Sequence, residues 1–429
     1  MASRPALRGV STAALAGKPP TRARHWGMTN ILRNGSRLLR HTLLVSLTLG
    51  AAAHAETIKV VSISPLTGPK AGLGIELRRG AEMALRMYTP LFNKFGHSLK
   101  LLPLDDQANP TRAGLLSRVL QGDQRILGIM GPQNSGVTNA LATALKASPI
   151  AMVSPTSTND ALTGQGWTYF GRVVAPDRAQ AVAAAQYIAQ TLKPQSVYVI
   201  SDNTTYGNGL TTVMQDNLGR LNVTVAGYVG ASTPEQVEDA VRRVKGTDPD
   251  VVYYAGTDVA GVPLIKALRA AGVKAPFVGG DGLYSATFTD GAGPAAQGVV
   301  FSSTFAVPDK LPLAQRFVAE YRARYKAEPN PRALYAFDAM SVMLRGILNE
   351  VERTKGGVPT REQVIASVRK VNLPACAQSA MLTCPNLTGA LSFDPSGERR
   401  SSFVYMLEYG KSGGVNLISS EAVDAAQLK

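Results

Sequence analysis

The stretch that decides the fold is ILGIMGPQNSGVTNALATALKASPIAMVS, residues 126–154. It holds two short apolar runs, at 126–130 and 150–154, on either side of a helical pattern over 135–146. A short apolar run bounded by turn residues is typical of a strand buried on both faces. The stretch therefore predicts a β-α-β unit, in which a helix joins two parallel strands.

The same alternation continues in both directions. Toward the N-terminus it predicts strands at 58–64 and 99–104 and helices at 75–88 and 111–120. Toward the C-terminus it predicts strands at 196–201, 223–229, 251–254 and 276–279, and helices at 177–192, 207–218, 234–245 and 259–271. Eight strands with about as many helices exceed what one sheet of this kind usually holds, so we expect two doubly wound α/β lobes with parallel sheets.

After residue 301 the pattern becomes mainly helical. Helices are predicted at 311–325, 332–351 and 360–371, followed by strand-like runs at 387–393 and 403–409. Thr233 with Gln236, and Thr360 with Gln363, have the spacing of a capping box at a helix start. The late helices need a lobe to pack on, and no Gly/Ser linker separates the halves, so we expect the chain to pass between the lobes several times.

The first 55 residues resemble an export signal. Arg33, Arg37 and Arg40 precede an apolar segment at 43–49, and Ala-His-Ala at 53–55 fits a cleavage site. The apolar segment is shorter than the roughly 18 to 20 residues of a membrane-spanning helix, and no comparable run follows it. We expect residues 1–55 to be a leader and signal peptide, with Met28 as an alternative start.

Charge and histidine content restrict the function. Residues 1–55 hold eight Lys or Arg and no acid, so removing them lowers the net charge from +15 to +7, and the remaining basic residues form no run. This pattern does not favour a nucleic-acid partner. Only His97 lies beyond the leader, so a Ser-His-Asp triad or a His-rich zinc site would have to use it. We interpret His97 as a solvated loop residue.

Cys376 and Cys384 are the only cysteines, eight residues apart. In an oxidising compartment a local disulfide is the favoured interpretation, and two free thiols are the alternative. So short a loop would stabilise the fold by roughly 2.5 kcal/mol.

Sequence motifs of common enzymes are absent: the chain has no phosphate-binding P-loop, G-x-S-x-G or H-E-x-x-H pattern. Gly72-Leu-Gly74 lacks a third glycine and is interpreted as a turn at a helix start. Asp105-Asp106 could be a carboxylate pair for acid-base chemistry, but a solvated turn is favoured. We expect no enzyme activity, no cofactor and no metal site.

Polar loops follow two of the predicted strands. Gly131 to Ser135 opens a helix, where the Ser135 hydroxyl and free backbone N–H groups suit an anion. Ser154-Pro-Thr156-Ser-Thr158 offers hydroxyls and carbonyls. Ligands of open α/β sheets bind at the carboxyl ends of strands, so together these loops suit a zwitterion. Loops of this kind are also common helix caps, which is the alternative.

A series of motifs, in order along the chain, resembles the periplasmic leucine/isoleucine/valine-binding proteins of ABC transporters. They are Ser64-Pro-Leu-Thr-Gly-Pro69, Asp105-Asp106, Gly131 with Ser135, Ser154 to Thr158, Ser201-Asp202 with Tyr206-Gly207, Val252-Tyr-Tyr254, and Gly389 with Phe393-Asp394. The resemblance covers residues 58 to about 409 and implies two α/β lobes, three crossovers and a ligand cleft between the lobes.

The resemblance also implies where the lobes divide. Crossovers are expected near 174–175, 303–305 and 389–391, which gives a first lobe of 56–174 plus 305–389 and a second lobe of 175–304 plus 390–429. The late helices would then complete the first lobe.

The family's ligand contacts carry over to seven positions. Carboxylate and ammonium contacts fall on Ser135, Thr156 and Thr158, a second-lobe tyrosine on Tyr206, and the acidic partner of the ligand ammonium on Asp281. Two aromatic positions of the family are Leu73 and Thr257 here, Asp281 replaces a longer Glu, and the family's N-terminal cysteines would fall at Ala108 and Asn134. These departures put specificity for aliphatic amino acids in doubt.

The function expected from sequence is that of a periplasmic solute-binding protein of an ABC importer. Its ligand would be a branched-chain-like amino acid or a similar small polar molecule, bound by cleft closure. Its partners would be this ligand and an inner-membrane ABC permease, and the protein itself a monomer. The alternatives are a carboxylate or amide binder on the same fold, a ligand-sensing receptor module and, less favoured, an exported hydrolase.

Overall fold

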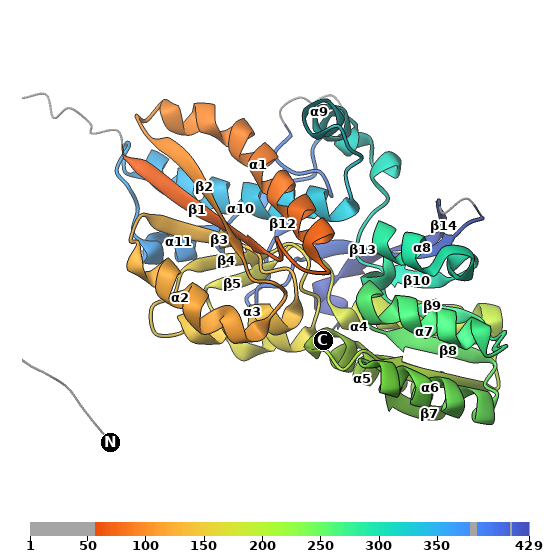
Figure 1. Ribbon diagram of the computed structural model, residues 1–429. Coiled ribbons are helices and arrows are strands. Elements are labelled where there is room, and N and C mark those ends of the chain that lie inside the picture. The colour runs from red at the N-terminus through yellow and green to blue at the C-terminus, as the bar shows by residue number, and fades with distance from the viewer. Residues whose placement is uncertain (1–55, 378–383, 412–413, 429) are drawn as a thin grey trace, which may run out of the picture. The chain divides into compact units, whose positions relative to one another are not determined.

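The computed structural model describes residues 56–377, 384–411 and 414–428, so the leader and signal peptide predicted at 1–55 lie outside the described residues. The chain forms two sheets, each covered by helices on both faces (Figure 1). We call the part built on the first sheet the first lobe and the part built on the second sheet the second lobe. The two-lobed α/β fold predicted from sequence is confirmed.

The first sheet has five parallel strands in the order β2-β1-β3-β4-β5. The strands are β1 (Thr57–Ser64), β2 (Ser98–Asp105), β3 (Ile126–Met130), β4 (Ala151–Ser154) and β5 (Phe170–Arg172). Apolar side chains of β3 and β4 are buried on both faces of the sheet, which explains their continuous apolar sequences.

Two pairs of helices cover this sheet. Helices α1 (Ala71–Asn93) and α10 (Pro331–Arg353) pack on one face through a core that includes Leu77 and Met340. Helices α2 (Ala113–Gly122) and α3 (Ser135–Leu145) pack on the other through Leu120 and Leu141. The late helices α9 (Gln315–Tyr325), α10 and α11 (Arg361–Val368) all belong to the first lobe, which confirms that the chain returns to it.

The second sheet has seven strands in the order β14-β13-β10-β9-β8-β6-β7. Five are parallel: β6 (Ser196–Ser201), β7 (Thr224–Gly230), β8 (Val251–Ala255), β9 (Phe277–Gly279) and β10 (Val300–Ser303). The last two, β13 (Ser401–Tyr409) and β14 (Val415–Asp424), run antiparallel, so this sheet is mixed at one edge and not purely parallel as expected. Its helices are α4 (Asp177–Tyr187), α5 (Thr205–Arg220), α6 (Pro234–Thr247), α7 (Asp258–Ala270) and α8 (Ala286–Ala292).

The chain passes between the two sheets three times: from β5 to α4, after β10, and before β13. The predicted strand at 387–393 is wrong for most of its length, since only β12 (Leu391–Ser392) forms, paired with β11 (Asn372–Leu373). The exact limits of the lobes stay a prediction.

Local predictions at the helix starts had mixed outcomes. The Thr360–Gln363 capping box is confirmed, with both reciprocal hydrogen bonds. At Thr233 only the hydroxyl half forms, because the Gln236 side chain accepts from Ser232 N at 2.9 Å.

The interpretations of His97 and Asp106 as solvated residues are wrong, because both side chains are buried. His97 Nε2 lies 2.7 Å from the carbonyl oxygen of Gly356, a residue that follows α10. The Asp106 carboxylate accepts from Ala108 N at 2.8 Å, and burial raises its pKa to about 6.

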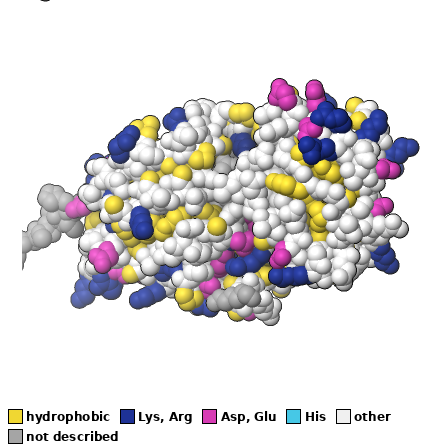
Figure 2. Space-filling model, turned by 90° about the horizontal axis from the view of Figure 1, so that it is seen from below, with side chains coloured by type: hydrophobic (Ala, Val, Ile, Leu, Met, Phe, Trp, Pro, Cys, Tyr) yellow, Lys and Arg dark blue, Asp and Glu magenta, His cyan; other side chains and the backbone are white. Residues whose placement is uncertain are grey.

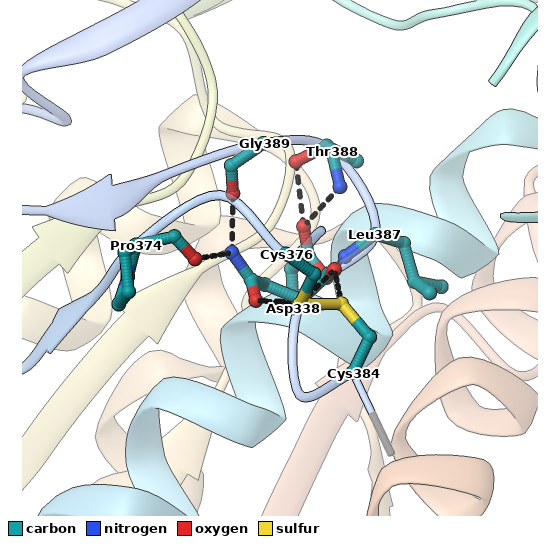
Figure 3. Close-up of a disulfide and its surroundings, with 8 residues drawn as sticks. Asp338, Pro374, Cys376, Cys384, Leu387, Thr388 and Gly389 are labelled. Atoms are coloured by element: carbon teal, nitrogen blue, oxygen red, sulfur yellow. Dashed lines mark hydrogen bonds between the residues drawn. A yellow bond between two sulfur atoms is a disulfide. The ribbon is translucent and has the colours of Figure 1, made fainter. Parts of the chain in front are cut away.

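The predicted disulfide between Cys376 and Cys384 is confirmed (Figure 3). Beside it, the buried Asp338 of α10 accepts hydrogen bonds from the backbone N–H groups of Leu387 and Thr388 at 2.7 and 3.0 Å. The disulfide therefore closes a short loop, and the residues that follow this loop are hydrogen-bonded to α10.

Among the residues described, no helix combines the length and apolar character needed to cross a membrane. The same residues contain no group of three or more His, Cys, Asp or Glu placed to hold a metal ion.

Candidate functional site

A cavity of about 290 Å³ lies between the lobes, at the carboxyl ends of the strands of both sheets. Its size is at the lower end of the range for small-molecule sites, which suits a small metabolite. All seven residues predicted as ligand contacts line it: Leu73, Ser135, Thr156, Thr158, Tyr206, Thr257 and Asp281. The structure thus brings the predicted residues together, and their contact with a ligand stays a prediction.

The first lobe supplies the start of α3. Gly131 leads into it with φ +110°, and a Cβ here would lie 2.2 Å from the carbonyl oxygen of Ile63, so only glycine fits. The N-cap residue Asn134 makes no side-chain cap hydrogen bond, and Ser135 and Gly136 line the cavity. The first backbone N–H groups of α3 are therefore available to an anion.

The hydroxyls around this helix start have different roles. Thr156 donates to the carbonyl oxygen of Gln133 at 2.9 Å, so its remaining lone pairs can only accept. Ser135 Oγ accepts from Asn159 N at 3.4 Å, which leaves its proton for a ligand carboxylate. Burial raises the pKa of the Asp177 carboxyl well above its usual range. A hydrogen bond from the Thr158 side chain acts in the opposite direction and lowers this pKa.

The second lobe presents Asp281 to the same cavity. Its two carboxylate oxygens accept from Tyr206 Oη and Thr304 Oγ1, each at 2.7 Å. Burial and the adjacent Asp281 charge raise the pKa of Tyr206, so the phenol stays a neutral donor. These neutral donors hold the carboxylate in place, and among the described residues its charge has no ion-pair partner.

Thr257 is held in place by hydrogen bonds to another residue of the second lobe. Its backbone N–H donates to Asp202 Oδ2 at 2.8 Å, and its hydroxyl lies 3.2 Å from the same oxygen. The neighbouring Asp258, which also lines the cavity, accepts from Ser285 Oγ at 2.6 Å. Asp202, behind Thr257, and Asp258 are thus both fixed by hydroxyl or backbone donors.

Sequence reasoning missed two cations that line the cavity, Lys70 and Arg332. Arg332, at the start of α10, donates to the carbonyl oxygen of Asp281 at 2.8 Å, and its guanidinium lies 4.5 Å from the ring centre of Phe305. Lys70 is the N-cap residue of α1. A positive charge at a helix start opposes the helix dipole, and this unfavourable placement was the signal that could have drawn attention to both.

Contacts between the lobes are already present beside the cavity. Asn159 Nδ2 of the first lobe donates to the carbonyl oxygen of Thr205 in the second at 2.8 Å. Arg332 reaches from α10 to Asp281 and Tyr284 of the second lobe.

Surface charge gives little contrast on the face shown in Figure 2. Lys and Arg side chains there are scattered among Asp and Glu side chains. The predicted absence of a nucleic-acid partner stays a prediction.

Curated relatives agree with this architecture. The chain is 28% identical to the Leu/Ile/Val-binding protein of Citrobacter freundii, over 71% of this chain and 83% of the relative. It is 30% identical to the Leu/Ile/Val-binding protein BraC3 of Rhizobium johnstonii, over 72% of this chain and 84% of the relative.

Solved structures show the same fold. The leucine binding protein LivK of Thermotoga maritima matches with a TM-score of 0.74 and 23% identity, over 86% of this chain and 99% of that one. A solute binding protein of R. palustris in complex with benzoate matches with a TM-score of 0.72 and 20% identity, over 86% of this chain and 98% of that one.

The family model described as periplasmic binding protein matches residues 57–412, which include every residue of the cavity and all strands of the two sheets except β14. Members of this family are solute-binding proteins. With the two-lobed fold and the cavity between the lobes, this match shows that the chain belongs to the periplasmic binding protein family.

Proposed function

We propose that the protein is exported to the periplasm, binds an α-amino acid between its lobes and delivers it to an ABC permease. The observation that carries the proposal is the pairing of two poles in one cavity: the free N–H groups and Ser135 hydroxyl at the start of α3, and the carboxylate of Asp281 in the second lobe. The first pole suits a ligand carboxylate and the second a ligand ammonium. The curated relatives that bind leucine, isoleucine and valine support the same ligand class.

Binding by cleft closure follows from the position of the two poles. Because they belong to different lobes, a ligand makes both sets of contacts only when the lobes are close together, and it therefore shifts the population toward the closed form. The closed form is the one that a permease would recognise. We propose that the protein acts as a monomer and carries out no catalysis.

A carboxylate binder is the second candidate. It is favoured by the Arg332 guanidinium, which lies over the Phe305 ring at the wall of the cavity, and by the benzoate complex of the R. palustris relative in fold. A ligand without an amine would leave Asp281 unused, which is why the amino acid is preferred.

Thermal unfolding with a ligand panel tests this function. The panel holds amino acids, aromatic acids, dicarboxylates and amides, each near 100 times its Kd or at a fixed high concentration. Bound ligand stabilises the folded protein, by about 2.7 kcal/mol at 100 times the Kd. We expect amino acids to raise Tm, with mass spectrometry of the same samples showing no conversion. A rise in Tm with aromatic acids alone would transfer the function to the second candidate.

A further inference from the structure

Lys70 is a cation at the cavity with no partner of its own. Among the described residues its side chain makes no hydrogen bond and no ion pair, although it is partly buried at the cavity wall. Leu73, three residues further along the first turn of α1, lines the same cavity. Residues three apart on a helix share a face, so Lys70 and Leu73 present one surface to a ligand.

The charged groups around Lys70 do not form a pair with it. Asp202 uses both carboxylate oxygens on Thr204 and Thr257, and Asp258 accepts from Ser285 and lies at the favourable start of α7. The carboxylate of Asp106 accepts from Ala108 N.

Several features of the site disfavour the charge of Lys70. Burial lowers the pKa of Lys70, and the neighbouring Arg332 lowers it further, while Asp202, Asp258 and Asp106 act in the opposite direction. The start of α1 also places the positive end of its helix dipole beside the ammonium. An unpaired ammonium in such a place is costly unless an anion meets it.

The two poles proposed for an α-amino acid do not use Lys70. The α-carboxylate is assigned to the start of α3 and the α-ammonium to Asp281, so both charges of the backbone are already matched. Lys70 is left to meet a third group. On the basis of the proposed function, we propose that Lys70 is a specificity-determining residue that binds a side-chain carboxylate, so that the preferred ligand is an acidic amino acid.

Titration calorimetry with matched ligands tests this proposal. Wild type, Lys70→Met and the control Lys266→Met are compared; Lys266 is exposed on α7 and does not line the cavity. The ligands are glutamate with glutamine, aspartate with asparagine, leucine, and glutarate. We expect the wild type to bind one acid at least tenfold more tightly than its amide, Lys70→Met to lose that preference, and Lys266→Met to keep it.

The outcomes separate this inference from the proposed function. If the wild type binds leucine or an amide as tightly as the acids, or if Lys70→Met keeps the preference, the role of Lys70 is wrong and the amino-acid function stands. If glutarate binds through Lys70 while no amino acid binds, the amino-acid function is wrong and the role of Lys70 stands. If no ligand binds to folded wild type, both are wrong. Lys70→Gln repeats the test should Lys70→Met fail to fold.

Discussion

Two cations, the fully buried Arg172 and the partly buried Lys70, differ in how their charges are paired. Arg172, on β5, is fully buried and donates to Glu398 Oε2 at 2.8 Å and to the carbonyl oxygen of Asn159 at 2.7 Å. The side chain of Lys70, at the cavity, makes no hydrogen bond and no ion pair among the described residues. Hydrogen bonds and an ion pair within the protein offset the desolvation cost of the Arg172 charge, whereas the Lys70 ammonium has no such partner. We infer that the paired charge of Arg172 serves the fold and that the unpaired charge of Lys70 serves a ligand.

The location of each cation agrees with this distinction. Glu398 precedes β13, so its ion pair with Arg172 joins the chain near the first crossover to the chain near the third. Arg399 adds to this junction by donating to the carbonyl oxygen of Val173 at 2.9 Å. Lys70 and Arg332 lie instead where a small molecule can reach them.

The largest expected effect comes from breaking the paired charge. Glu398→Gln leaves the buried guanidinium of Arg172 without its ion-pair partner, and we expect it to lower the free energy of unfolding by about 3–5 kcal/mol. Urea denaturation measures this loss. The control is Asp216→Asn, which breaks an exposed pair with Arg220 and should cost no more than about 1 kcal/mol.

Ligand affinity should distinguish this loss from a functional one. Glu398 does not line the cavity, so the folded fraction of the variant should bind ligand as wild type does. A loss of stability no larger than that of the control would remove the basis for calling Arg172 structural.

Removal of the disulfide tests the structural side of the comparison at a second place. We expect Cys376→Ser with Cys384→Ser to lower the free energy of unfolding by roughly 2.5 kcal/mol, since a short loop is released in the unfolded chain. Affinity should not change, because neither cysteine lines the cavity. Wild type from the periplasm should show no free thiol after denaturation, and two titratable thiols would contradict the pairing.

Asp281 is an intermediate case, a carboxylate with neutral donors and an expected cationic ligand. Asp281→Ala should weaken binding of an amine-bearing ligand at least tenfold, or about 1.4 kcal/mol. Ser135→Ala should weaken it less, because the backbone N–H groups at the start of α3 remain. Calorimetry measures both, with the exposed Asp290→Ala as control. Unchanged affinity in Asp281→Ala together with a large loss in Ser135→Ala would indicate an acid without an amine.

The sequence was most informative where local pattern and burial coincide. β3 and β4 are continuous apolar runs, and their positions agree with prediction to within a residue. β5 and β10 were missed because polar residues interrupt their apolar runs, Arg172 in β5 and Ser302 with Ser303 in β10. β14 was missed because its side chains are nearly all exposed, so no apolar pattern marks it.

The candidate site divides in the same way. Ser135 and Thr156 follow strands, so position alone indicated them, and resemblance added Asp281. Lys70 and Arg332 were missed because they lie at the same cavity only once α10 has returned to the first lobe. No local sequence pattern indicates this return. His97 was misjudged for a related reason, since its partner Gly356 lies 259 residues further along the chain.

The smallest expected effect, a change in stability near zero, is also the sharpest test of the comparison. A cation that is structural, as Arg172 is, would lower the free energy of unfolding by several kcal/mol when removed. Lys70→Met retains much of the aliphatic stem and removes a charge that burial, Arg332 and the α1 dipole all disfavour. We therefore expect unliganded Lys70→Met to be as stable as wild type or more stable by up to about 1 kcal/mol.

Urea denaturation without ligand, beside the exposed control Lys266→Met, measures this difference. A loss of 3 kcal/mol or more, about the cost of breaking a buried pair, would mean that Lys70 has a protein partner in solution. The charge would then belong to the fold, as that of Arg172 does, and the distinction between paired and unpaired cations would fail at the cavity. If Lys70→Met is at least as stable as wild type and has lost the preference for acidic ligands, Lys70 contributes to ligand binding and not to the stability of the unliganded protein.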